Sequence, residues 1–220
     1  MKRTLPIIIL SVLFFCQKAV SQLSLADEAL HSGDMLFCTD RSGDLSGAID
    51  RATQSGRETH FSHVAIVECR GDSIWVIHSA PKKGVCRESL KQFIATEQPY
   101  MLDVYRLKPE WQKAIEPALQ QAEALLGEKY NFSYRIEDPG IYCSELIWML
   151  FRKSDIFTLA PMSFSDALTG MPIAEWQQHY RKLGIAIPEG EPGCNPNGMA
   201  ASEKLTWFGK LKTDGTGLNN

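Results

Sequence analysis

The strongest constraint on the fold is a pair of β-branched and aromatic runs, FSHVAIVEC at residues 61–69 and SIWVIH at residues 73–78. The triplet Arg70-Gly71-Asp72 separates the two runs. Two such runs around a short glycine-containing turn predict an antiparallel β-hairpin. We therefore interpret the triplet as a turn and not as a cell-adhesion signal.

The register of this hairpin decides where its two histidines point. A two-residue loop at residues 70–71 pairs Cys69 with Asp72. In the same register His63 lies directly opposite His78, on one face of the sheet, with the two Cβ atoms about 5 Å apart. A three-residue loop would place the two imidazoles on opposite faces, because side chains alternate along a strand.

The second chemical feature is Cys143. The turn signal Asp138-Pro139-Gly140 precedes it, and the apolar segment SELIWMLF at residues 144–151 follows it. This pattern predicts that Cys143 lies in the first turn of a helix. Unpaired N–H groups and the positive end of the helix dipole stabilise a thiolate there. A buried core cysteine is the alternative interpretation, since free cysteine is among the most buried residue types.

These three side chains together have the chemistry of a cysteine hydrolase. Cys143 is the candidate nucleophile, His63 the general base, and His78 the group that fixes the tautomer of His63. The Cys143 backbone N–H is a candidate oxyanion donor. A zinc site made by the same three residues stays open as an alternative. His60 and His63 make a poor chelating pair, because positions three apart on a strand face opposite sides.

The segments around these residues resemble the NlpC-type papain-like cysteine peptidases. In most of that superfamily the cysteine helix comes first, whereas here it follows the histidine strands, as in the circularly permuted YiiX/YebB-like branch. That branch is also compared with lecithin:retinol acyltransferases. The matching segments are SGDMLF (32–37), FSHVAIVE…WVIHSAPKKGVCRESLKQF (61–93), GEKYNFSY (127–134) and YCSEL (142–146).

The resemblance covers residues 33–151 and implies an α+β fold, a circularly permuted papain-like (NlpC-type) domain with a small antiparallel sheet or barrel packed against helices. It assigns Cys143 as the nucleophile, His63 as the base and His78 as the third polar residue. Many permuted members carry glutamate in the third place, where this chain has histidine.

The first residues have the pattern of a secretory signal peptide. Lys2-Arg3 precedes a short apolar run, and Ala19-Val20-Ser21 is a small-x-small cleavage site. We expect residues 1–21 to be removed and residues 22–220 to form one exported domain, periplasmic or secreted, without stable membrane insertion. The apolar run is shorter than the roughly 20 residues needed to span a bilayer. A lipoprotein acylated at Cys16 is the alternative, which the preceding Phe14-Phe15 disfavours.

Composition excludes some function classes. The chain has 220 residues, 44% of them hydrophobic, and a formal net charge of -3, as in an ordinary globular domain. No basic run with interleaved aromatic residues is present, so we expect no nucleic-acid partner. Five cysteines follow residue 21, and an odd number leaves at least one thiol free. The sequence contains no CxxC pair that would support a structural zinc site, and we expect neither a metal nor a cofactor. The spacing of Cys69 and Cys86 is compatible with a disulfide bridge between them.

Further elements follow from local patterns. Three tyrosines near the nucleophile, Tyr130, Tyr134 and Tyr142, are candidate substrate-binding residues, with core packing as the alternative for each. His179 is expected at the surface. We expect strands at 35–38 and 101–107, helices at 23–30, 45–53, 87–94, 110–126 and 173–183, irregular structure at 154–172, and a loop-rich tail after residue 183.

The function predicted from these observations is an exported cysteine amidase that cleaves cell-wall (peptidoglycan) peptides or other small amides. We expect charged side chains in two loops before the His63 strand to lie at the cleft mouth, where they suit a peptide with free ionic ends. A lipid ester or amide hydrolase or acyltransferase is the first alternative, and a non-catalytic binding module is the second. The charged residues are Asp34, Asp40, Arg41, Asp44, Arg57 and Glu58.

Overall fold

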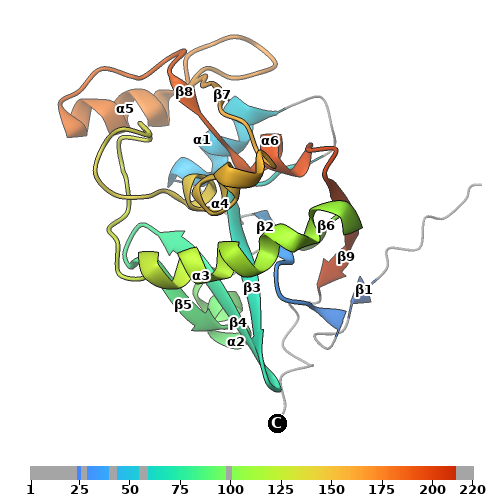
Figure 1. Cartoon of the computed structure of the whole chain (residues 1–220). Coiled ribbons are helices and arrows are strands. Elements are labelled where there is room, and N and C mark those ends of the chain that lie inside the picture. Colours follow the sequence, from blue (N-terminus) through green and yellow to red (C-terminus); the bar gives the residue numbers. More distant parts are fainter. Residues whose placement is uncertain (1–23, 26–28, 40–43, 55–58, 98–100, 212–220) are drawn as a thin grey trace, which may run out of the picture.

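The computed structural model describes residues 24–25, 29–39, 44–54, 59–97 and 101–211. At its centre is an open sheet with the strand order β1-β9-β6-β2-β3-β4-β5 (Figure 1). Neighbouring strands are antiparallel except for the short β1, which runs parallel to β9. The predicted α+β class is confirmed, and the described strands form a sheet that does not close into a barrel. The strands are β1 (Ser24–Leu25), β2 (Met35–Thr39), β3 (His63–Arg70), β4 (Ser73–Ala80), β5 (Gly84–Ser89), β6 (Met101–Leu107) and β9 (Leu205–Leu211), with a separate pair β7 (Ala160–Pro161) and β8 (Pro192–Gly193).

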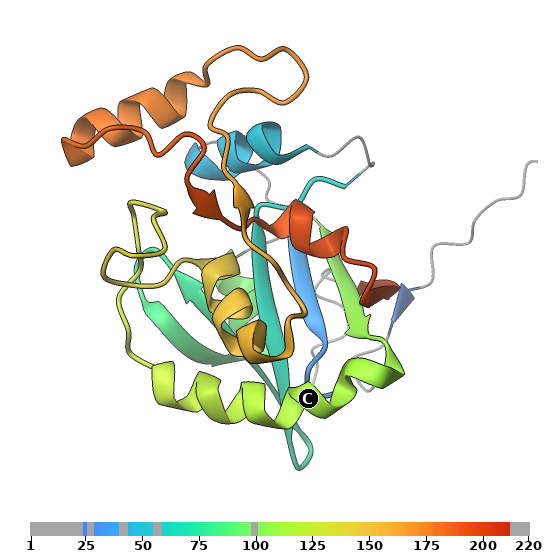
Figure 2. The same ribbon diagram turned by 45° about the horizontal axis from the view of Figure 1, so that its top comes forward.

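Helices cover both faces and one end of this sheet. In Figures 1 and 2, α3 and α4 cross one face, whereas α1, α5 and α6 gather around the end where β3 begins. None of the described helices is long and apolar enough to cross a membrane. The helices are α1 (Asp44–Thr53), α2 (Leu90–Glu97), η2 (Pro109–Ala114), α3 (Ile115–Leu125), α4 (Cys143–Phe151), η3 (Arg152–Ser154), α5 (Ala174–Leu183) and α6 (Pro196–Ala200).

The alternation of side chains along β3 builds two apolar layers. Val64 and Ile66 are fully buried in the cluster that includes α3 and α4. Ala65 and Val67 point to the opposite face and pack in the cluster that includes Phe93 of α2. Because both faces of β3 are covered by other elements, the middle of its sequence is a continuous run of apolar residues and does not alternate between apolar and polar residues. His63 shares the α2 face with Ala65 and Val67, since it lies two residues before Ala65.

The predicted hairpin is present, but its predicted register is wrong by two residues. Cys69 pairs with Ile74, so the two-residue loop is 71–72 and not 70–71. Gly71 has a φ of 57°, as required where glycine is the first central residue of a hairpin turn. His63 and His78 are therefore diagonal neighbours and not directly opposite. They still share one face, because a shift of two preserves the alternation of side chains.

Three other predicted elements differ from the structure. Residues 87–89 were expected to be helical but belong to strand β5, which pairs with β4 along its whole length. The tail after residue 183 was expected to be loop, yet it supplies α6 and β9, and β9 pairs with β6. The predicted helix 110–126 is η2 followed by α3, because Pro117 is compatible only with the first turn of an α-helix.

Two predictions fall largely or wholly outside the described residues. Within the predicted helix 23–30, residues 24–25 form strand β1, and residues 26–28 are not described. The predicted signal peptide at residues 1–21 also lies outside the described part of the chain.

Candidate active site

Cys143 is the first residue of α4, as the sequence predicted. The helix start is held by Glu145, whose carboxylate accepts a hydrogen bond of 3.0 Å from the backbone N–H of Tyr142. Burial raises the pKa of Glu145 to about 7, against the hydrogen bonds from Tyr142 and Asn131 that lower it. The Cys143 backbone N–H lies in the first helical turn, where N–H groups have no partner within the helix. The thiol thus stands beside positively polarised backbone groups.

Cys143 borders two cavities. One, of about 310 Å³, is lined by His63, Glu97 and His179 among others. The second, of about 210 Å³, is lined by Met162 and a set of aromatic and small residues, and none of the described residues that line it is charged. The nucleophile candidate and the base candidate therefore share one chamber, at the end of the sheet where β3 begins. Cys143 also borders a second chamber with a different lining.

His63 and His78 are joined by a hydrogen bond of 3.0 Å between Nε2 of His63 and Nδ1 of His78. Their rings are nearly perpendicular, at 87°, and Phe93 of α2 packs edge-on against His78. His78 is completely buried. Burial, followed by the neighbouring His63, lowers the pKa of His78 to about 3, although Glu88 opposes the shift. His78 is therefore neutral at physiological pH.

A fourth residue, Glu88 of β5, completes the chain of hydrogen bonds. Its Oε2 lies 3.0 Å from Nε2 of His78, and Lys83 binds Oε1. Burial raises the pKa of Glu88, but the hydrogen bonds from Lys83 and His78 outweigh burial and hold it below its ordinary value. The side chain is consequently a carboxylate, which only accepts hydrogen bonds.

The ionisation of Glu88 fixes the proton positions along the chain. Since Glu88 accepts, Nε2 of His78 carries the proton, and Nδ1 of this neutral ring must accept. Nε2 of His63 then donates to His78, so that in the neutral form of His63 the lone pair is on Nδ1. The arrangement Glu88–His78–His63 thus determines which ring nitrogen of His63 carries the proton when the ring is neutral. Glu88 is not among the residues predicted for the site, because the helix predicted at residues 87–94 does not place it beside His78, whereas strand β5 does.

The residues from 29 to 208 match the family model described as permuted papain-like amidase enzyme, YaeF/YiiX, C92 family. The chain belongs to this amidase family. It is 27% identical over 159 residues to the uncharacterised protein YiiX of Escherichia coli K12, covering 72% of this chain and 68% of that protein. A crystal structure described as metalloprotein YiiX from Escherichia coli O157:H7 superimposes with a TM-score of 0.64 at 26% identity, covering 82% of this chain and 97% of the other. The chain is accordingly a cysteine hydrolase with a permuted papain-like fold.

The three tyrosines named from the sequence all line the cavities of this amidase. Tyr130 borders the larger cavity, Tyr142 the smaller one, and Tyr134 borders both. The hydroxyl groups of Tyr130 and Tyr134 lie 3.5 Å apart. Tyr134 has a φ of 59°, in the left-handed region that non-glycine residues rarely adopt. Tyr134 therefore combines an unusual backbone conformation with a position in the lining of both cavities.

The structure also places two other residues considered in the sequence. His179 is partly exposed, in keeping with the expected surface position, and it also lines the larger cavity, where its Nε2 lies 2.7 Å from the carbonyl oxygen of Phe132. Asp34 was expected at the cleft mouth, but it is completely buried and paired with Arg106. The positions 40, 41, 57 and 58 lie outside the described residues, as does the side chain of residue 44.

The structure also decides the predicted alternatives that involve a disulfide bridge, His60 or a metal ion. Cys69 and Cys86 are both free, so no bridge joins them. His60 is exposed and paired with Asp50, apart from the His63–His78 pair. Within the described residues, the group of three side chains with a metal-binding arrangement is His78, Cys86 and Glu88, and not the predicted set containing Cys143.

Proposed function

We propose that Cys143 attacks the carbonyl carbon of an amide bond with His63 as general base. The observation that carries this proposal is the buried chain Glu88–His78–His63, which ends in the cavity that Cys143 lines. In this scheme Nδ1 of His63 takes the thiol proton and later gives it to the leaving amine. Water then hydrolyses the thioester. The backbone N–H of Cys143 stabilises the oxyanion of both tetrahedral intermediates.

His78 and Glu88 act as positioning residues in this mechanism. His78 accepts from Nε2 of His63 and so keeps the lone pair of neutral His63 on Nδ1. Glu88 keeps His78 in the tautomer that can accept. When His63 becomes an imidazolium, the carboxylate at the end of the chain stabilises the positive charge through the neutral ring of His78.

For the substrate we propose short cell-wall peptides. The larger cavity supports this choice, because its lining includes the carboxylate of Glu97, which can pair with a substrate amino group, and the imidazole of His179. Tyr130 and Tyr134 supply hydroxyl groups and ring faces in the same chamber. The proposal includes export, on the signal pattern of residues 1–21.

A second candidate is hydrolysis of an acyl amide or ester. The smaller cavity favours it, because Met162, Phe164 and Trp176 line it, and its lining within the described part of the chain contains no charged side chain. Its volume of about 210 Å³ is below the roughly 300–1,000 Å³ of sites that enclose a drug-sized ligand. The cavity therefore suits a single apolar side chain or a short acyl group better than a long lipid tail.

The test is to incubate the mature protein with peptidoglycan fragments and, separately, with acyl amides and esters, and to identify the products by mass spectrometry. Cleavage of a peptide amide that is lost in Cys143→Ala and kept in Cys69→Ala supports the first candidate. Cys69 is a matched control because it is also a free thiol but lies at the far end of β3. Release of an acyl group with the same dependence on Cys143 would favour the second candidate and refute the peptide assignment.

A further inference from the structure

The cluster His78–Cys86–Glu88 has a geometry that its role in positioning His63 does not require. Cys86 lies opposite His78 in the β4–β5 register, and Glu88 is two residues further along the same face of β5. The Cys86 Sγ atom lies 3.3 Å from Nε2 of His78, and Oε2 of Glu88 lies 3.0 Å from the same nitrogen. One ligand atom of His78, one of Cys86 and one of Glu88 all lie within 4.8 Å of one another.

These distances suit a tetrahedral zinc ion. Zinc bonds of about 2.0–2.3 Å to nitrogen, oxygen and sulfur place neighbouring ligand atoms roughly 3.3–3.6 Å apart. The Sγ atom of Cys86 and Oε2 of Glu88 each stand within a few tenths of an ångström of that spacing from Nε2 of His78, and the ligand atoms of Cys86 and Glu88 lie within 4.8 Å of each other. Thiolate, imidazole and carboxylate are also the ligand types that zinc takes.

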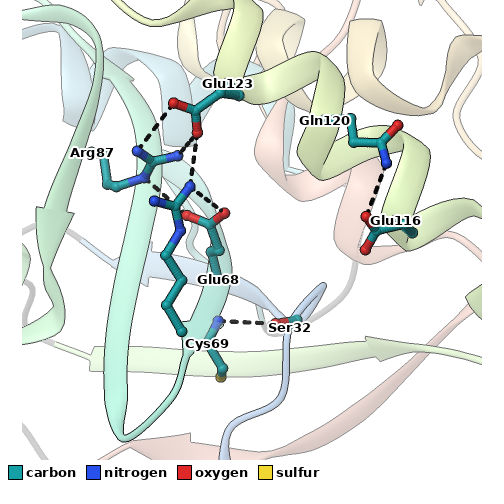
Figure 3. Close-up of polar contacts among 8 residues, drawn as sticks. Ser32, Glu68, Cys69, Arg87, Glu116, Gln120 and Glu123 are labelled. Atoms are coloured by element: carbon teal, nitrogen blue, oxygen red, sulfur yellow. Dashed lines mark hydrogen bonds and ion pairs between the residues drawn. The ribbon is translucent and has the colours of Figure 1, made fainter.

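The direction of the β5 side chains is fixed by the opposite face of the strand. Figure 3 shows Arg87 pointing to Glu123 of α3 and to Glu68 of β3, and its Nε lies 2.9 Å from Oε2 of Glu68. With Arg87 held toward α3, its neighbours Cys86 and Glu88 must face His78, because side chains alternate along a strand. The ligand set is therefore preorganised by the fold.

We propose that His78, Cys86 and Glu88 bind a zinc-type divalent metal ion, and that the bound ion switches the amidase off. Binding itself rests only on this cluster, whereas the inhibitory effect rests on the proposed catalytic roles of His63 and His78. The fourth coordination position is left to water or an external ligand. Cys86 is partly exposed on the edge strand of the sheet, which gives the ion a path from solvent.

Inhibition follows from the hydrogen-bond directions. Coordination uses the lone pair of Nε2 of His78, so the single proton of the neutral ring moves to Nδ1. Nδ1 then donates to Nε2 of His63, which must accept and carries its own proton on Nδ1. That nitrogen can no longer take the thiol proton of Cys143. The overall proton balance is the release of one proton from the Cys86 thiol to solvent.

The surrounding charges are compatible with a cation. Lys83 binds Oε1 of Glu88 and leaves Oε2 for the ion. The carboxylate of Glu97 lies 3.9 Å from Nδ1 of His78 and adds negative charge on the side facing His63. The positive charge of Lys83 is therefore opposed by two carboxylates and, in the bound state, by the Cys86 thiolate.

The binding test uses the full mature chain carrying Cys143→Ala, so that the catalytic thiol cannot be a ligand. We expect this protein to bind one equivalent of Co²⁺, a spectroscopic substitute for zinc, with a thiolate-to-cobalt charge-transfer absorption. Adding Cys86→Ser should abolish that absorption, and adding Cys69→Ser should leave it intact. Cobalt binding without a thiolate band, or a band that persists in the Cys86→Ser variant, would overturn the proposal.

The activity test uses the chain with its Cys143 intact. We expect one equivalent of Zn²⁺ to abolish turnover and a chelator to restore it. In Cys86→Ser, the rate with Zn²⁺ should be close to the rate with the chelator. Activation by Zn²⁺ would overturn the inhibitory assignment. If Cys86→Ser does not fold, Cys86→Ala replaces it in both tests. Binding without inhibition would refute the tautomer argument alone, because the binding result does not depend on the substrate or on the nucleophile.

Discussion

Glu88→Gln is the most informative substitution, because it removes one charge while keeping the size of the side chain and an acceptor oxygen for Nε2 of His78. A hydrogen bond to a charged group contributes about 1.5–3 kcal/mol, against about 0.5–1.5 kcal/mol for a neutral pair. Glu88 is only 8% exposed, so solvent does not compensate for the lost charge. A difference of about 1–1.5 kcal/mol in the stability of the His63 imidazolium corresponds to a roughly tenfold lower kcat. Glu88→Ala also leaves the buried N–H of His78 without its acceptor, and we expect kcat to fall on the order of 10–100-fold.

The assay is steady-state hydrolysis of the amide substrate, with kcat and KM determined separately. Glu88 lines neither cavity next to Cys143, so kcat should fall while KM stays constant. Glu123→Gln is the matched control, since Glu123 binds Arg87 on the opposite face of the sheet (Figure 3) and should leave kcat unchanged. Thermal unfolding verifies that each variant is folded. A Glu88→Gln enzyme with wild-type kcat would refute the argument that the carboxylate acts through His78.

Three further predictions concern the same site. Cys143 should react with iodoacetamide at neutral pH faster than Cys86 and Cys194, because burial raises the pKa of those two thiols to about 11 and about 12, and uniform labelling would contradict this. His63→Ala should abolish turnover, whereas His78→Gln should retain a measurable part of it because its amide oxygen can still accept from His63; equal and complete loss in both variants would contradict these roles. Because the pKa of His78 is about 3 in the folded state and ordinarily 6.5, the stability it contributes is present above pH 6.5 and is lost as the pH falls. Urea unfolding should therefore show the free energy of unfolding dropping by about 1.5 kcal/mol between pH 6.5 and pH 5, a drop that should be absent in His78→Gln.

Some of the site was predictable because its determinants are local. The turn before Cys143 and the apolar run after it specify a helix start, and the structure has α4 beginning at that residue. The hairpin strands were also predicted, and the shared face of His63 and His78 survived a wrong turn position. Moving a two-residue loop by one position shifts the register by two, which preserves the alternation of side chains.

Glu88 and the C-terminal strand were not predictable in this way. The segment RESLKQFI at residues 87–94 has a composition compatible with a helix, and only pairing with β4 extends the chain through residue 89. Strand β9 pairs with β6, which lies about a hundred residues earlier in the sequence, so no local sequence pattern predicts this pairing. Long-range pairing overrides weak local preference at both places.

The sequence by itself thus determined which groups carry the chemistry, namely a thiol at a helix start and two imidazoles on one face of a hairpin. Only the tertiary structure decided the protonation and the surroundings of those groups. The neutral state of His78 and the proton on its Nε2 depend on complete burial and on Glu88 of a neighbouring strand. Burial and hydrogen-bond direction are properties of the packed molecule, because they arise where separate elements exclude water together.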